Sequence, residues 1–331
     1  MAKKHTDKIP LKRAAWIQRT AAALGVTESE AADILRTERR QSLRLNPLQG
    51  DPERTLANLN ASGFSGEPYA WAPDCYTVTS TIETMRDSSD VTAGRAFIQN
   101  AASWIPVLAL DPRPGDLILD VCAAPGGKTS HIAAMTQNQA RIWANDNSRP
   151  RLAKLQANMQ RLNAQIERYA LYDATQLARK LEGEQFDRIL LDAPCSGEGL
   201  MQLDRDADFA TWSVAHIKRL QQLQKRILVQ VWQLLKPGGT LVYSTCTMAP
   251  EEDESVVDYL LRSQSDAQIV RLELNLPNRV PTVREWNGKT FAPEAQGCMR
   301  LKPSEQIEAF FVCKLQKVDM AHKATYSKAL V

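Results

Sequence analysis

The chain reads Leu117-Ile118-Leu119-Asp120-Val121-Cys122-Ala123-Ala124-Pro125-Gly126-Gly127-Lys128-Thr129 where an apolar run meets a glycine-containing turn. The pattern predicts a buried strand that ends near Asp120, a tight turn, and a helix that starts near Gly127. Glycine lets the backbone approach a ligand closely, and a helix N-terminus favours negative charge. Ligands bind beyond the carboxyl ends of the strands in a parallel sheet. This segment therefore predicts a ligand-binding turn at the end of the first strand.

Strands and helices alternate in the part of the chain that follows residue 92. Strands are predicted at residues 117–121, 141–145, 167–172, 187–192, 240–246 and 309–315. Helices are predicted at residues 93–107, 127–136, 148–162, 213–235 and 251–264. Pro250 and the acids at 251–254 suit the start of the last helix, because acids stabilise a helix N-terminus. The alternation predicts an α/β fold with a doubly wound, mostly parallel sheet.

The residues before 92 show a different pattern. Helices are predicted at residues 10–24, 27–40 and 53–62, and a strand at residues 41–46. Thr27 and Glu30 have the spacing of a capping box. Residues 63–92 are rich in Gly, Pro, Ser, Thr and Asp, which predicts short strands and loops. The expected domains are a small α+β domain at residues 1–92, a larger α/β domain at residues 93–316, and a tail at residues 317–331.

The composition is that of an ordinary globular protein, with 331 residues of which 44% are hydrophobic and 24% charged. No run approaches the roughly 20 apolar residues that span a bilayer. The N-terminus lacks the apolar core of a secretory signal. The six cysteines form no CxxC pair, which argues against a zinc site and against a disulfide scaffold. Free thiols fit a reducing cytoplasm, so a cytoplasmic protein without a metal is expected.

Positive charge is concentrated near the N-terminus. The whole chain carries a net charge of +3, whereas residues 1–60 hold eleven Lys or Arg and seven Asp or Glu, an excess of four. This excess is compatible with contacts to phosphates. A solvated helical face explains it equally well.

Two nucleotide-phosphate motifs fit the glycine-containing turn poorly. Residues 127–129 match the end of a phosphate loop, but Cys122 stands where that loop requires a glycine. The second strand ends at Asp146 and the third near Asp173, so that with Asp120 an acid follows each of three strands. Such acids suit an adenosine ligand without phosphates, and S-adenosylmethionine fits better than NAD. Each acid taken alone is more often a helix cap or a turn residue.

Two cysteines follow apolar runs that predict the fourth and fifth strands. Cys195 ends the run Asp-Ala-Pro-Cys, and Cys246 ends the run Ser-Thr-Cys. In a doubly wound sheet both thiols are expected at the edge that binds the ligand. Isolated cysteines are commonly small buried hydrophobes. The remaining cysteines are interpreted in this way, namely Cys75, Cys122, Cys298 and Cys313.

Three segments resemble, in their order, the motifs of the Nop/Sun family of RNA 5-methylcytosine methyltransferases. They read DVCAAPGGKTS at residues 120–130, LDAPCSGEG at residues 191–199 and STCTMAPEEDES at residues 244–255. The resemblance covers residues from about 41 to 315. Two departures are Glu308-Ala309, where the family usually has Asp-Gly, and Ala102-Ser103, where a serine pair is usual. The resemblance implies a Rossmann-like class I methyltransferase whose N-terminal domain faces RNA.

The resemblance also implies a covalent reaction. Cys246 would add to carbon 6 of a cytosine in RNA and thereby make carbon 5 nucleophilic. Cys195 would assist the later elimination, and Asp192 would hydrogen-bond the edge of the base. Lys128 would orient the site or favour the thiolate, unless it only caps the start of the helix.

The cofactor that the resemblance implies is S-adenosylmethionine. Asp146 would bind its ribose and Asp173 its adenine, and Arg151 would support the ribose side unless it is only a surface residue. The other residues expected at the cofactor are Cys122, Ala123, Ala124, Pro125, Gly126, Gly127, Lys128 and Asp192. The expected partner is RNA, with ribosomal RNA ahead of transfer RNA, and a monomer is expected.

Three other functions compete with this interpretation. A DNA cytosine methyltransferase would use a thiol at the position of Cys195 and none after the fifth strand, so Cys246 argues against it. An amine methyltransferase would carry an aromatic residue after Asp-Pro-Pro or Asn-Pro-Pro, and the segment that ends at Cys195 has none. A catalytically idle RNA-binding assembly factor is disfavoured because both cysteines and all three acids are present.

Overall fold

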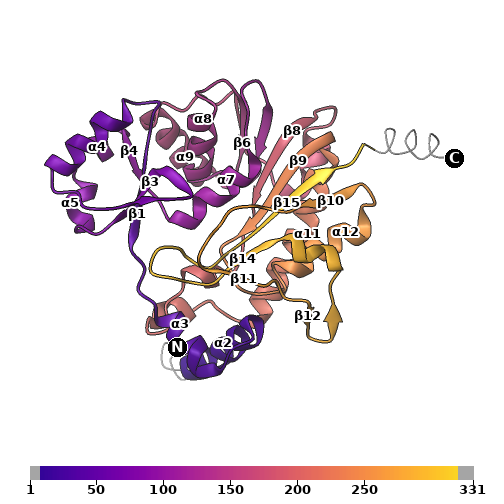
Figure 1. Cartoon of the computed structure of the whole chain (residues 1–331). Helices are drawn as coiled ribbons and strands as arrows, with labels where there is room; N and C mark the ends of the chain where they lie inside the picture. Colours follow the sequence, from indigo (N-terminus) through magenta and orange to yellow (C-terminus); the bar gives the residue numbers. More distant parts are fainter. Residues whose placement is uncertain (1–7, 320–331) are drawn as a thin grey trace.

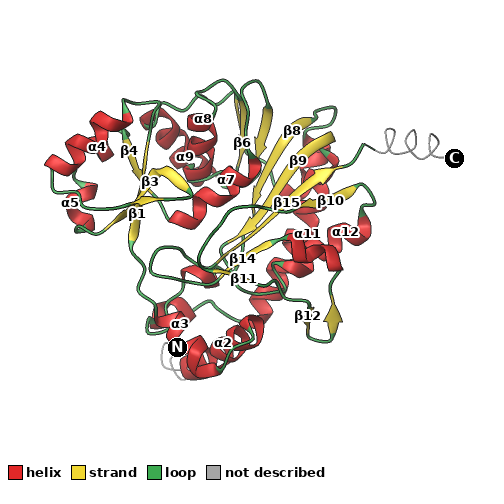
Figure 2. Cartoon of the chain, in the orientation of Figure 1, coloured by secondary structure: helices red, strands yellow, loops and turns green. Residues whose placement is uncertain are grey.

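The computed structural model describes residues 8–319, in which a central sheet lies beside a smaller N-terminal sheet (Figure 1, Figure 2). Five parallel strands of the central sheet lie in the order β7-β6-β5-β8-β9. Their bounds are β5 Leu117–Asp120, β6 Arg141–Asn145, β7 Arg168–Ala170, β8 Phe186–Asp192 and β9 Leu235–Thr245. The chain runs outward in both directions from β5, so the carboxyl ends of β5, β6 and β8 form a crevice at this switch point. The predicted α/β fold with a mostly parallel sheet is confirmed.

Antiparallel strands extend the central sheet beyond β9. β15 (Phe310–Lys317) pairs along β9, and its far edge is shared by β14 (Met299–Leu301) and β10 (Ala267–Val270). β11 (Arg279–Val280) pairs with β14, while β12 (Glu285–Trp286) and β13 (Lys289–Thr290) form a separate hairpin. Lys317 is the last residue of β15, and residues 320–331 of the predicted tail lie outside the described residues.

Helices cover both faces of the central sheet. One apolar cluster joins α7 (Ile105–Leu110), α8 (Gly127–Met135) and α9 (Arg149–Arg161) to side chains such as Ile118 of β5. A second joins α10 (Leu177–Lys180), α11 (Val214–Gln233) and α12 (Glu254–Ser263) to side chains such as Leu119. Ile118 and Leu119 are successive residues, and successive side chains of a strand point to opposite faces. The sheet is thus the middle of three layers.

The N-terminal sheet has the strand order β2-β3-β1-β4. Its strands are β1 Gln41–Leu45, β2 Pro68–Tyr69, β3 Ala72–Val78 and β4 Ala96–Ile98. Short helices α4 (Pro52–Ala61), α5 (Ile82–Arg86) and α6 (Ser89–Thr92) lie beside it. The first two described helices, α2 (Ile9–Leu24) and α3 (Glu28–Arg36), pack instead against residues that follow β8. The predicted capping box of α3 is confirmed, because Thr27 and Glu30 accept hydrogen bonds from each other's backbone.

The helix predicted at residues 93–107 is wrong in its first half. Ala96–Ile98 form β4, which pairs antiparallel with β1, and a 3-10 turn η1 (Ala101–Trp104) precedes α7. Pro106 stands in the first turn of α7, where it needs no backbone hydrogen bond. Inside a longer helix its ring would clash with the preceding turn. The N-terminal sheet therefore extends beyond residue 92.

The helix predicted at residues 251–264 also starts later than expected. α12 begins at Glu254, and residues 251–253 form a buried turn before it. These acids therefore do not serve as the first turn of the helix. Likewise, α11 ends at Gln233 and β9 begins at Leu235, so residues 236–239 belong to the strand instead of a helix-ending loop.

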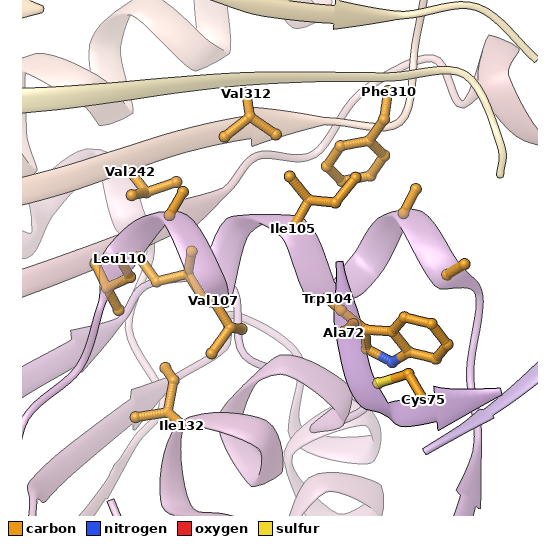
Figure 3. Close-up of a cluster of buried hydrophobic side chains, with 14 of the residues drawn as sticks. Ala72, Cys75, Trp104, Ile105, Val107, Leu110, Ile132, Val242, Phe310 and Val312 are labelled. Atoms are coloured by element: carbon orange, nitrogen blue, oxygen red, sulfur yellow. The ribbon is translucent and has the colours of Figure 1, made fainter. Parts of the chain in front are cut away.

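Trp104 joins the two sheets. Its side chain is fully buried, and its ring lies 5.3 Å from Tyr69 and 5.9 Å from Trp71 between ring centroids. Figure 3 shows Trp104 beside Ala72 and Cys75 of β3, at the start of the segment that continues into α7. The packing therefore connects the N-terminal sheet to the helix that covers the central sheet.

Trp104→Ala is expected to lower the free energy of unfolding by about 3–5 kcal/mol, because a large buried aromatic side chain leaves a cavity. Urea unfolding followed by circular dichroism measures this loss. Leu11→Ala is the control, since Leu11 on α2 is 72% exposed and should change stability by no more than about 0.5 kcal/mol. Equal effects of the two substitutions would contradict the proposed joining role of Trp104.

Candidate active site

A cavity of about 290 Å3 lies at the carboxyl ends of the parallel strands. Its lining comes from the ends of β6 and β8 and from the segments that follow β5, β6, β7, β8 and β9, and α11 adds the apolar side chains of Leu223 and Ile227. The lining residues are Val121, Cys122, Ala124, Asn145, Asp146, Asn147, Arg151, Tyr172, Asp173, Ala174, Asp192, Ala193, Pro194, Cys195, Leu223, Ile227 and Cys246. Six predicted cofactor residues and both predicted catalytic cysteines therefore lie around one space.

The glycine-containing turn separates this cavity from a second cavity of about 230 Å3. Gly126 has a φ of 107°, and an added Cβ would lie 2.5 Å from Met159 Cε, so this position requires glycine. Two side chains of α9 hold the turn: Arg151 donates to the Ala124 carbonyl at 2.8 Å, and Asn158 donates to the Pro125 carbonyl at 2.7 Å. The conformation of the turn is thus fixed by the neighbouring helix.

The second cavity is lined by most of the predicted cofactor residues that do not line the first. Ala123, Pro125, Gly127, Lys128 and Asp120 line it, and Cys122, Ala124 and Asp192 are shared by both cavities. Gly126 lines neither. Sequence reasoning did not assign Phe97, Ile98, Gln99, Asn100 or Ser103 to the site, although they line the second cavity. Their segment lies within the resemblance to the family, but residues 93–107 are predicted as a helix without a role in the site.

The three strand-end acids occupy different environments. Asp146 is 2% exposed, accepts from the Ser148 backbone at 3.0 Å and lies 3.2 Å from the Arg151 guanidinium. Asp173 is exposed and caps a 3-10 turn through the Thr175 backbone at 2.9 Å. Arg151 thus contacts both the turn and Asp146, so it is more than an isolated surface residue.

Asp120 is buried on the side of the second cavity. It accepts a hydrogen bond from Thr129 Oγ1 at 2.6 Å. Burial raises the pKa of Asp120 to about 7, although the Thr129 hydrogen bond and the charge of Lys128 oppose this shift. The acids after β5 and β6 therefore do not face the same part of the site.

The structure brings the two cysteines together at the ends of β8 and β9. The Sγ atoms of Cys195 and Cys246 lie 3.3 Å apart. The hydrogen bond with Cys246 and burial raise the pKa of Cys195 well above its usual value. Cys195 is therefore held as a thiol beside the sulfur of Cys246.

An ion pair lies next to the cysteines. Lys128 Nζ donates to Asp192 Oδ2 at 2.7 Å, and Ser244 Oγ donates to Asp192 Oδ1 at 2.8 Å. Burial opposes the charge of Lys128, but the adjacent Asp192 outweighs it and raises the Lys128 pKa. The Lys128 ammonium also lies 5.8 Å from the centre of the Phe310 ring. Its side chain thus reaches the end of β8 and does not cap its own helix.

Glu252 fixes the loop that carries Cys195. Its carboxylate accepts from the Ser196 backbone at 2.9 Å, from Ser196 Oγ, and from Gln224 Nε2 at 2.9 Å. Burial raises the pKa of Glu252 to about 7. Glu252 belongs to the Pro-Glu-Glu-Asp segment, for which the sequence predicts only the start of a helix and not a contact with the Cys195 loop.

Arg300 fixes the loop that carries Cys246. Its guanidinium lies 3.0 Å from Asp253 Oδ2 and 2.5 Å from Glu254 Oε2, and it donates to the Met248 carbonyl at 2.9 Å. Asp253 also accepts from Thr245 Oγ1 at 2.5 Å. Because Thr245 directly precedes Cys246, this buried network positions the end of β9.

Many N-terminal basic side chains are engaged within the protein. Arg39 donates to the carbonyls of Gly199 and Met201, and Arg19 lies 2.7 Å from Glu251. Arg13 and Arg40 pair with Asp206 and Glu305, respectively. These four basic side chains therefore have partners within the protein.

Within residues 8–319, no group of three or more His, Cys, Asp or Glu side chains is arranged to hold a metal ion. No helix in this range is both long and apolar enough to cross a membrane. Cys75, Cys298 and Cys313 are buried as expected, and all six cysteines are free.

Comparison with known proteins identifies the family. The family model of 16S rRNA methyltransferase RsmB/F matches residues 107–316. The chain belongs to this family. It is 37% identical over 281 residues to the tRNA (cytosine(49)-C(5))-methyltransferase of Pyrococcus abyssi, covering 84% of this chain and 88% of that protein. The expected membership of the Nop/Sun family is thus confirmed.

Two other relatives are covered by this chain over less than two thirds of their length. The ribosomal RNA small subunit methyltransferase F of Cronobacter sakazakii is 33% identical, over 91% of this chain and 62% of that protein. The 25S rRNA (cytosine-C(5))-methyltransferase nop2 of Schizosaccharomyces pombe is 32% identical, over 84% of this chain and 46% of that protein. A crystal structure of a methyltransferase homolog protein from Pyrococcus horikoshii matches with a TM-score of 0.76 and 29% identity, covering 91% of this chain and 99% of that one.

Asp120→Asn is expected to flatten the dependence of stability on pH. The pKa of Asp120 is about 7 in the folded protein, above its usual value of 3.8, so the folded state binds the proton more tightly. Its contribution to stability is complete below about pH 4 and is lost as the pH rises through 7, by at most about 1.4 kcal/mol per pH unit. Urea unfolding between pH 5 and 9 measures the slope. The two proteins should have equal slopes above about pH 8; equal slopes below about pH 7 would contradict this.

Proposed function

We propose that this chain transfers a methyl group from S-adenosylmethionine to carbon 5 of a cytosine in RNA through a covalent bond to Cys246. The observation that carries the proposal is the pair of sulfurs 3.3 Å apart, beside the Lys128–Asp192 ion pair. One sulfur serves a covalent addition and the second serves its reversal, which explains why two thiols are needed. Membership of the RsmB/F family supports the same reaction.

The residues divide the work of the reaction. Cys246 Sγ forms a bond to carbon 6, which makes carbon 5 of the ring nucleophilic. Bound S-adenosylmethionine supplies the electrophilic methyl group that carbon 5 attacks. Asp192 hydrogen-bonds the base edge and stabilises the charge that develops on the ring, with Lys128 and Ser244 holding its two oxygens. A base then takes the carbon 5 proton, and the sulfur–carbon bond breaks with its electron pair returning to Cys246 Sγ, which releases the methylated base. Cys195, once it has lost its own proton, assists this elimination as that base.

The first cavity fits the adenosine part of S-adenosylmethionine. Asp146 is buried at the cavity and offers carboxylate oxygens to a ribose diol, with Arg151 beside it. Asp173 lines the same space near the end of β7, where it reaches an exocyclic amine. Leu223 and Ile227 of α11 supply an apolar surface for the purine ring. The glycine-containing turn then borders the remainder of the cofactor.

Ribosomal RNA is the first proposed substrate, and the RsmB/F family model supports it. Transfer RNA is the second candidate because the chain covers 88% of the Pyrococcus abyssi tRNA methyltransferase but 62% of the Cronobacter sakazakii rRNA methyltransferase. Bisulfite sequencing of total RNA from cells with and without the gene separates the two. A cytosine protected only in the presence of the gene identifies the RNA and the position.

Asp146→Ala is expected to weaken S-adenosylmethionine binding by about 1–3 kcal/mol, because it removes hydrogen bonds inside a buried site. Isothermal titration calorimetry measures the change. Glu305→Ala is the control, since Glu305 is 67% exposed on its side chain and lies outside the lining of the first cavity. Unchanged affinity of the Asp146 variant would remove this residue from the cofactor site.

The two cysteines are expected to fail in different ways. Cys246→Ala should show neither methyl transfer nor a covalent adduct, because no thiol attacks carbon 6. Cys195→Ala should attack and transfer the methyl group but then stall as protein bonded to RNA. A labelled RNA substrate and a denaturing gel detect this stalled species.

Cys75→Ala is the matched control, because Cys75 is 2% exposed and lies outside both cavities. It should turn over without an accumulated adduct. If the Cys246→Ala variant accumulates the adduct and the Cys195→Ala variant forms none, then Cys195 is the nucleophile and Cys246 serves the elimination. Absence of any adduct in both folded variants would refute the covalent mechanism.

A further inference from the structure

Leu200 is an exposed apolar side chain on the segment that follows the Cys195 loop. It is 44% exposed and ends the 3-10 turn η3 (Glu198–Leu200), which follows the Cys195 loop. The neighbouring Gly199 N–H donates to the carbonyl of Cys246 at 2.9 Å. Leu200 therefore follows a residue whose backbone is hydrogen-bonded to Cys246, the proposed nucleophile.

The turn that displays Leu200 is held from several sides. Glu198 accepts from Trp212 Nε1 at 2.8 Å and from Thr247 Oγ1 at 3.2 Å. Arg39 donates to the carbonyl on each side of Leu200, those of Gly199 and Met201. The backbone of residues 198–201 is thus fixed by Trp212 just before α11, by Thr247 after β9 and by Arg39 of the N-terminal segment.

The residues on both sides of Leu200 are packed into the protein. A Cβ added at Gly199 would lie 2.2 Å from the Ala309 carbonyl, so the backbone here is pressed against the start of β15. The next side chain, Met201, is 8% exposed and packs in a cluster with Trp16 and Phe209. Leu200 alone in this segment points its apolar surface at solvent, while its neighbours are committed to the interior.

The position of Leu200 distinguishes it from other exposed apolar side chains among residues 8–319. Those others are Leu11, Met135, Leu171 and Tyr259. They lie on α2, at the end of α8, after β7 and on α12. Scattered exposed apolar residues are ordinary, but a rigidly held one beside a nucleophile provides a surface for the substrate.

We propose that Leu200 inserts into the RNA base stack at the place vacated by the target cytosine. This inference rests on the proposed function. Sulfur attack on carbon 6 requires a face of the ring to reach Cys246, which is only half-buried at the end of β9, so a stacked base must leave its neighbours. An apolar side chain that fills the gap keeps the two flanking bases out of contact with water and prevents the target from returning. The partner is an RNA whose target cytosine is stacked or paired.

The test compares two RNAs that carry the same cytosine, once mapped by bisulfite sequencing. One is a hairpin in which the cytosine lies within the stem, and the other is a short linear RNA in which it is unpaired. Leu200→Ala should lower kcat/KM by about tenfold or more on the hairpin and by less than about twofold on the linear RNA. Leu200→Phe, which keeps a large apolar surface, should restore activity on the hairpin.

Base opening itself gives a readout independent of turnover. A 2-aminopurine placed beside the target cytosine in the hairpin should gain fluorescence with the wild-type protein and with Leu11→Ala, but not with Leu200→Ala. S-adenosylmethionine affinity should be the same in all three proteins, which shows that the site is intact.

Equal loss of activity on both RNAs, or no loss on the hairpin, would overturn the role of Leu200 and leave the proposed function standing. A wild-type protein that transfers no methyl group to either RNA would instead refute the proposed function. The fluorescence result overturns the proposal if Leu200→Ala opens the base as well as the wild type does.

Discussion

The buried ion network around Arg300 is the interaction on which the cysteine site depends. Arg300 is 1% exposed and contacts two fully buried carboxylates, Asp253 and Glu254. Buried charges are tolerated only when they are paired and hydrogen-bonded, because each loses its hydration. Here the pairing also fixes Thr245, the residue before Cys246, through Asp253. The same buried ion pairs therefore also position Cys246 at the end of β9.

Two further acids lie next to the cysteine site in different environments. Asp192 is paired with Lys128 at the cavities, whereas Glu252 lies behind the Cys195 loop with its pKa raised by burial. Asp192 is thus paired with a cation at the cavities, whereas Glu252 holds the Cys195 loop through hydrogen bonds to Ser196. Burial and the neighbouring Cys246 sulfur raise the pKa of Cys195, so this thiol must give up its own proton before it can accept one in the elimination.

The N-terminal segment contributes to the site mainly through packing. Arg39 holds the carbonyls on both sides of Leu200, and α2 and α3 pack against the residues that follow it. Trp104 connects the N-terminal sheet to α7. A chain of contacts therefore joins the part of the protein expected to face RNA to the loops that carry the two cysteines. Of the basic residues that suggested phosphate contacts, Arg19 forms a largely buried pair with Glu251, whereas Arg13 and Arg40 pair with exposed acids.

The sequence by itself determined the parallel sheet, the turn after β5 and the strand-end positions of Cys195 and Cys246, because these follow from local patterns and from the rule that parallel strands end at one edge. Only the tertiary structure decided that Ala96–Ile98 form a strand, since their partner β1 is distant in sequence. It also decided that Glu252 and Asp253 are buried supports, because their partners Gln224 and Arg300 come from other elements. The 3.3 Å separation of the sulfurs likewise follows from the packing of two loops that no local pattern specifies.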